Sequence, residues 1–139
     1  MQGDIFQPVL AMLSLTAVVW LVLFARRLKY MTGNDISAEK VKTPEQLHQL
    51  LPDEVNASAN NFKNLFEVPV VFYVLCLVAF ALGQVDGLIL NCAWGFVLLR
   101  AIHSLIHCTY NRVMHRFVAY LGSCVLVWAM LVNLILKNF

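Results

Sequence analysis

Charged residues are scarce in this sequence. They make up 13% of the 139 residues, whereas ordinary soluble domains contain roughly 25%. Ten Lys and Arg against eight Asp and Glu give a net charge of +2, too small for a nucleic-acid-binding protein. No pair among the four cysteines has the spacing of metal ligands, and all four fall in apolar runs, as buried free cysteines do. These shortages exclude a soluble domain and a partner made of nucleic acid.

Long apolar runs are what the sequence has in abundance. Hydrophobic residues form 60% of the chain, and one membrane-spanning helix needs about 20 of them in succession. The predicted spans cover about 6–27, 61–82, 88–109 and 113–136, and the polar stretch 28–60 joins the first two. Short links at 83–87 and 110–112 make consecutive helices antiparallel neighbours. We therefore predict one all-α domain, an integral membrane antiparallel four-helix bundle.

Basic residues predict how the bundle is oriented. Nine of the ten Lys and Arg fall on one side of the membrane, and only Lys137 falls on the other. Because basic loops stay in the cytoplasm, the stretch 28–60 and the link 110–112 should be cytoplasmic. Both termini are then expected outside the cytoplasm, and a bacterial inner membrane is the expected location.

One group of polar residues opens the second span. Asn60, Asn64 and Glu67 are spaced i, i+4 and i+7, so a continuous helix would present them on one face, with Lys63 beside them. An ionisable side chain inside a span is costly and marks a functional site by default. An ion pair between Glu67 and Arg100 that only joins two helices is the structural alternative.

Two further groups lie at the cytoplasmic ends of the third and fourth spans. The first group is Arg100, His103 and His107, at offsets of 0, 3 and 7 residues. The second is Arg112, Arg116 and Tyr120, at offsets of 0, 4 and 8. Each spacing again places the group on one helix face. Together the groups predict a cytoplasm-facing pocket for a small ligand that carries carboxylates and an amine. Arginine binds carboxylates through two parallel hydrogen bonds, and a nearby cation lowers the pKa of a thiol. The candidate residues of this pocket are Asn60, Lys63, Asn64, Glu67, Arg100, His103, His107, Arg112, Arg116 and Tyr120.

These motifs and their order resemble the MAPEG family, the membrane-associated proteins in eicosanoid and glutathione metabolism. The most specific matches are Asn64-x-x-Glu67, Arg100-x-x-His103, and Arg116 followed by Tyr120. The resemblance implies a homotrimer that binds glutathione between adjacent subunits near the cytoplasmic side. It also implies an enzyme that conjugates, reduces or isomerises lipophilic electrophiles and hydroperoxides in contact with membrane lipid.

The resemblance also implies roles for single residues. Arg116 would stabilise the glutathione thiolate as a catalytic residue, with Tyr120 as its partner, while Arg26 or Arg27 would bind a glutathione carboxylate. The residues implied to hold glutathione are Asn64, Glu67, His103, Arg116 and Tyr120. Lysine and asparagine stand at 63 and 60, where family enzymes carry arginine, and lysine lacks the planar two-point grip. His107 replaces a tyrosine of the family pattern, and the proline follows Glu67 by two residues rather than three.

Three hypotheses from different classes remain at this point. The first is a glutathione-dependent transferase or peroxidase. The second is a protein that keeps the family fold without the activity and binds lipid or a partner. The third is a membrane metalloenzyme in which His103 and His107, spaced i and i+4, share a metal with Glu67 or His115.

Overall fold

The computed structural model describes residues 1–139 and contains helices but no strands. Four helical segments, at Gln2–Gly33, Asp53–Ala81, Gly87–Cys108 and Val113–Asn138, are long and apolar enough to cross a membrane. The prediction of an all-α four-helix membrane protein is therefore confirmed. In chain order the elements are η1 (Gln2–Ile5), α1 (Phe6–Gly33), η2 (Ala38–Lys40), α2 (Pro44–Leu50), α3 (Asp53–Asn64), α4 (Val68–Ala81), α5 (Gly87–Cys108) and α6 (Val113–Asn138).

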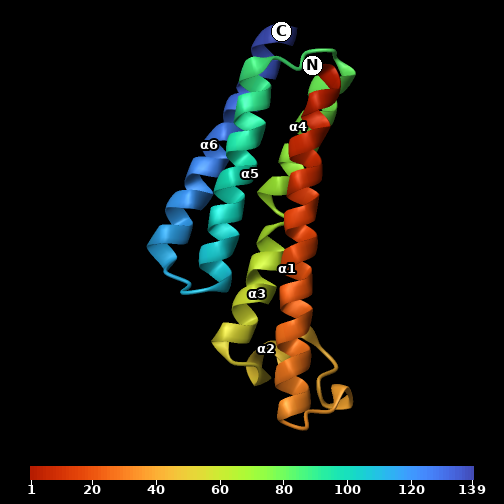
Figure 1. The fold of residues 1–139 in the computed structure, drawn as a ribbon, viewed down its shortest axis with the longest axis vertical. Helices are drawn as coiled ribbons and strands as arrows, with labels where there is room; N and C mark the ends of the chain where they lie inside the picture. The colour runs from red at the N-terminus through yellow and green to blue at the C-terminus, as the bar shows by residue number, and fades with distance from the viewer.

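The four crossings run side by side, so that both chain termini lie at one end of the bundle (Figure 1). We call this the terminal end, and the opposite end, which holds residues 34–52 and the turn 109–112, the loop end. The turn joins α5 and α6 and includes Asn111 at φ 49°, a left-handed conformation in which asparagine is enriched. The segments α1 and α3 continue past this turn, so the loop end is stepped (Figure 1).

The second crossing is broken, whereas the sequence predicted one helix over 61–82 with a kink at Pro69. The segment α3 ends at Asn64, α4 begins at Val68, and Glu67 adopts the non-helical angles φ −97° and ψ −104°. Pro69 explains the break, because proline has no N–H and its ring clashes with the carbonyl four residues earlier, here that of Leu65. In the first turn of α4 the same proline is tolerated.

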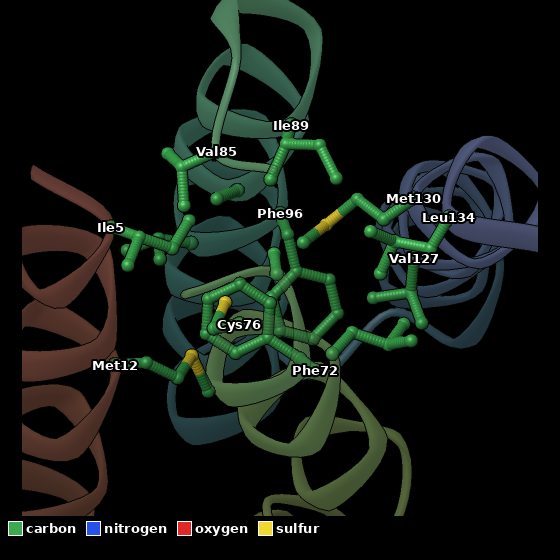
Figure 2. Close-up of a cluster of buried hydrophobic side chains, with 14 of the residues drawn as sticks. Ile5, Met12, Phe72, Cys76, Val85, Ile89, Phe96, Val127, Met130 and Leu134 are labelled. Carbon is green, nitrogen blue, oxygen red and sulfur yellow. The ribbon is translucent and has the colours of Figure 1, made fainter. Parts of the chain in front are cut away.

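The bundle interior is packed with apolar side chains from all four crossings. Phe72 of α4 and Phe96 of α5 are fully buried, and their rings stack with centroids 4.5 Å apart. Met12 of α1 and Met130 of α6 approach this pair from either side (Figure 2). Flexible methionine side chains fill the gaps that the rigid rings leave.

Small residues bring α5 and α6 into close contact. A Cβ atom at Gly95 would lie 2.8 Å from Leu126 Cδ1, and one at Gly122 would lie 3.0 Å from Leu99 Cδ1. A leucine side chain of the opposite helix therefore packs directly against each glycine. In lipid, where little hydrophobic force drives helices together, such close packing is a main source of association.

Polar contacts fix the terminal end. Asp86 caps α5, because its Oδ1 accepts a 2.9 Å hydrogen bond from the Ile89 N–H, and its Oδ2 pairs with Lys137 Nζ at 2.5 Å. The Ile89 N–H and the Lys137 ammonium hold the pKa of the Asp86 carboxyl below its ordinary value of 3.8. Asp86 thus joins the start of α5 to the end of α6.

Candidate functional site

A polar cleft of about 280 Å³ opens where the break in the second crossing faces α5 and α6. Seven of its nine lining residues come from the polar groups that the sequence singled out. The lining residues are Asn60, Asn64, Glu67, His103, His107, Val113, Arg116, Phe117 and Tyr120. We call this space the polar cleft.

Glu67 owes its position to the break. It is exposed and precedes the first residue of α4, where the positive end of the helix dipole favours a carboxylate. Its Oε2 accepts a 2.9 Å hydrogen bond from Asn64 Nδ2. No other hydrogen bond involves the carboxylate, so Oε1 is free to accept one from a ligand.

Arg100 lies behind the cleft wall rather than in it. The residue is completely buried, and its Nη2 donates to both the backbone oxygen and the Oδ1 of Asn64. Its Cζ lies 5.6 Å from the centre of the Tyr120 ring, within the range of a cation–π contact. Glu67 and Arg100 form no ion pair. The two ion pairs in the chain are Met1–Asp4 and Lys137–Asp86. Asn64 stands between the two charges instead.

The two histidines of α5 are buried at the inner wall of the polar cleft. His103 Nδ1 lies 2.8 Å from the backbone oxygen of Arg116, which ties α5 to α6, and the ring of His107 is 5.5 Å from that of His103. No three His, Cys, Asp or Glu side chains gather as a metal would require. The structure therefore gives the metalloenzyme hypothesis no ligand set.

Arg116 and Tyr120 line the cleft one turn apart on α6, as their spacing predicted. Arg116 Nη1 donates a 2.5 Å hydrogen bond to Asn111 Oδ1, its one side-chain bond, which leaves Nε and Nη2 free. Asn111 in the turn thus orients the guanidinium. A cation, a phenol and an acid across from them can hold a ligand that carries both signs of charge.

A second cleft adjoins the first at Asn60, which lines both. It measures about 290 Å³ and lies among α1, α2 and α3. Two predicted cations, Arg27 and Lys63, gather here, together with Glu45 and His48. We call this space the basic cleft. Its other lining residues are Pro44, Gln49 and Ala59.

Two further predicted arginines, besides Arg100, lie in neither cleft. Arg112 is exposed and has extended backbone angles, φ −74° and ψ 117°. It therefore lies just before α6 and does not share the helix face of Arg116. Arg26 Nη2 donates a 2.5 Å bond to the Cys108 oxygen at the end of α5, and its Nη1 donates to Ser58. Arg26 therefore ties three helices together and lines a separate cavity of about 540 Å³.

Three residues near the polar cleft were absent from the sequence analysis. Asn111 holds Arg116, and the occurrence of asparagine in a very short link was the signal that could have marked it. Val113 and Phe117 line the cleft and are 61% and 50% exposed. Their apolar side chains gave no signal distinct from ordinary lipid contact.

Comparison with known proteins gives one match. The sequence model of the MAPEG family matches residues 5–136, nearly the whole chain. No curated protein and no solved structure matches.

Proposed function

Since the chain belongs to the MAPEG family, we propose that it is a membrane-bound, glutathione-dependent transferase or peroxidase. Its second substrate is a lipophilic electrophile or hydroperoxide. The observation that carries the proposal is the gathering of seven polar residues, distant in sequence, in the polar cleft.

The chemistry of the two clefts matches that of glutathione. The tripeptide carries two carboxylates, one ammonium group and one thiol. Glu67 offers the free Oε1 to the ammonium, while Arg27 and Lys63 in the basic cleft offer positive charge to the carboxylates. Asn60 lines both clefts and offers an amide where the tripeptide passes from one to the other.

Arg116 and Tyr120 are the residues that we assign to the reaction. Bound glutathione supplies the sulfur nucleophile. The free Nε and Nη2 groups of Arg116 favour the thiolate over the thiol, so the proton leaves for water before the sulfur attacks. Tyr120 donates a hydrogen bond from its hydroxyl to the same sulfur. In a transfer reaction the thiolate forms a bond to the electrophilic carbon. The bond from that carbon to its leaving group, such as a halide, breaks, and the leaving group departs into solvent with the electron pair.

Lipophilic substrates have a route to the cleft through its apolar edge. Val113 and Phe117 are exposed on α6 and line the cleft beside Arg116. A substrate dissolved in the bilayer would meet these side chains first. The clefts at the loop end would open to the cytoplasm, from which glutathione enters.

We also propose that the chain assembles as a homotrimer, on the basis of family membership. Family enzymes bind glutathione between adjacent subunits, so in such a trimer a neighbouring subunit would add contacts at the open side of these clefts. Chemical cross-linking in mild detergent should give a trimer as the largest species. A ladder that stops at the dimer would contradict this assembly.

Titration of the purified protein with glutathione tests the function. We expect saturable binding at millimolar concentrations or below, with thiolate absorbance at neutral pH that is absent from free glutathione. Turnover with an electrophilic aromatic halide should follow the same saturation. Absence of both binding and thiolate would contradict the enzyme and favour the non-catalytic family member.

A further inference from the structure

Arg100 presents an unusual arrangement for a membrane helix. Its guanidinium cannot lose its charge, the side chain is completely buried, and no carboxylate pairs with it. Nε and Nη1 have no hydrogen-bond partner in the chain, and Nη2 makes both of its bonds to Asn64. A charge kept at such cost is a sign of function rather than of packing.

The bond from Arg100 decides which way the Asn64 amide points. An asparagine amide has an oxygen that accepts and a nitrogen that donates, and either can face a given neighbour. Arginine only donates, so the Asn64 oxygen must face Arg100. The Asn64 nitrogen is thereby turned to Glu67, where it donates the 2.9 Å bond to Oε2.

We infer that Arg100 is a positioning residue that acts through Asn64 to fix the carboxylate of Glu67 for recognition of a primary ammonium group. This inference rests on the proposed function, because it names the part of glutathione that Glu67 selects. Arg100 itself does not line the polar cleft, so it would act on a ligand there only through Asn64 and Glu67. With Oε2 held by Asn64, Oε1 is the atom left for the ligand.

The arrangement predicts a specific selectivity. A carboxylate held in one rotamer accepts best from a donor that arrives along one direction, as a protonated amine on a tripeptide anchored elsewhere does. Without Arg100 the Asn64 amide could turn its oxygen to Glu67, and two acceptors would repel each other. The carboxylate would then move and bind an ammonium group no better than solvent does.

Binding of two ligands tests the inference. The full-length protein is titrated with glutathione and with glutathione whose amine is acetylated. The wild type should prefer the free amine by about tenfold or more, as one hydrogen bond to a charged group provides. In Arg100→Gln this preference should fall to about threefold or less, the value of a solvent-screened contact. Arg100→Lys, which still only donates, should restore it.

A matched control separates positioning from packing. Ser104→Ala removes another buried hydrogen bond of α5, the 3.3 Å bond to Asn61, and should lower stability without changing the preference. If Arg100→Gln fails to fold, Asn64→Ala removes the donor to Glu67 directly and should lose the preference. A preference that survives in Arg100→Gln or in Asn64→Ala would overturn the inference.

Nuclear magnetic resonance of protein labelled with ¹⁵N-asparagine gives a readout that needs no ligand. The Asn64 side-chain signal, identified by its loss in Asn64→Ala, should shift in Arg100→Gln and in Glu67→Gln but not in Ser104→Ala. If the wild type binds no glutathione and the signal shifts in this way, the proposed function fails while the positioning of Glu67 stands. If glutathione binds and the signal stays in place in Arg100→Gln, the inference fails while the proposed function stands.

Discussion

Asn64 donates a 2.9 Å hydrogen bond to Glu67 across the break between α3 and α4. The two residues would lie one turn apart on a continuous helix, but the break moves Glu67 out of the helix to the exposed start of α4. The carboxylate therefore stays at the edge of the cleft and in contact with solvent. This avoids the high cost of burying an ionised carboxylate without a charged partner.

Glu67→Gln should weaken glutathione binding and leave the thiol almost unaffected. The loss should be about tenfold in the dissociation constant, as expected for one hydrogen bond to a charged group. Glutamine keeps the size of the side chain but not its charge. Calorimetric titration measures the binding, and thiolate absorbance against pH measures the thiol. Glu39→Gln, an exposed acid in η2 outside both clefts, is the control and should change neither quantity.

Periodicity in the sequence predicted the four crossings and most of the polar cleft. The cleft residues recur at helical spacing in α3, α5 and α6, and spacing along a helix translates directly into a shared face. Glu67 reached the cleft by a different route, since the break makes its helical register irrelevant. The sequence indicated a kink at Pro69 and did not predict that the helix would end before it.

Periodicity did not predict how deeply a side chain is buried or how the turn between α5 and α6 is shaped. Arg100 shares a face with His103, yet which of the two reaches the cleft depends on how α3 and α5 pack. Arg112 fits the spacing of Arg116 but has extended angles before α6, where helical periodicity does not apply. Asparagine in a short link suggests a turn at Asn111, but the bond from its side chain to Arg116 depends on how that turn packs.

Two leucines of α4 should respond differently to truncation. Leu75 is 6% exposed, and Leu77 on the same helix is 54% exposed. Leu75→Ala should lower the free energy of unfolding by about 2–3 kcal/mol. This is near the low end for a buried leucine, because lipid also solvates apolar groups in the unfolded state. Leu77→Ala should cost much less. Unfolding in mixed micelles measures both, and equal losses would contradict the packing of α4.

Acid should weaken the contact between α5 and α6 at the terminal end. The pKa of Asp86 is lowered on folding, so its charge stabilises the folded state above pH 3.8 and this stability is lost as the pH falls through the lowered pKa. Asp86→Asn keeps a capping oxygen, so it should slightly lower the unfolding temperature at neutral pH and not in strong acid. Asp86→Ala also removes the capping oxygen, which should lower the free energy of unfolding by about 1 kcal/mol more. A gap between wild type and Asp86→Asn that does not change with pH would contradict the role of the charge.

Thiol labelling should establish the orientation of the bundle. Lys40→Cys places a reporter at the loop end and Phe139→Cys places one at the terminal end, both at exposed positions. In intact cells, a reagent that does not cross membranes should label only Phe139→Cys, and in inverted vesicles only Lys40→Cys. The wild type, whose four cysteines lie within the helices, gives the background. The reverse pattern would place the clefts away from cytosolic glutathione.

Arg116→Leu should separate thiolate formation from binding. Wild-type protein should lower the pKa of bound glutathione from about 8.5, the ordinary value of a thiol, to about 7. Without the guanidinium, thiolate absorbance at neutral pH should disappear and turnover should fall with it, while binding weakens only moderately because Glu67, Arg27 and Lys63 are retained. Arg112→Leu removes an equal charge from an exposed side chain outside both clefts and should have a much smaller effect. If Arg116→Leu leaves both thiolate and turnover intact, the assignment of Arg116 is wrong, and His107, which also lines the cleft, becomes the next candidate.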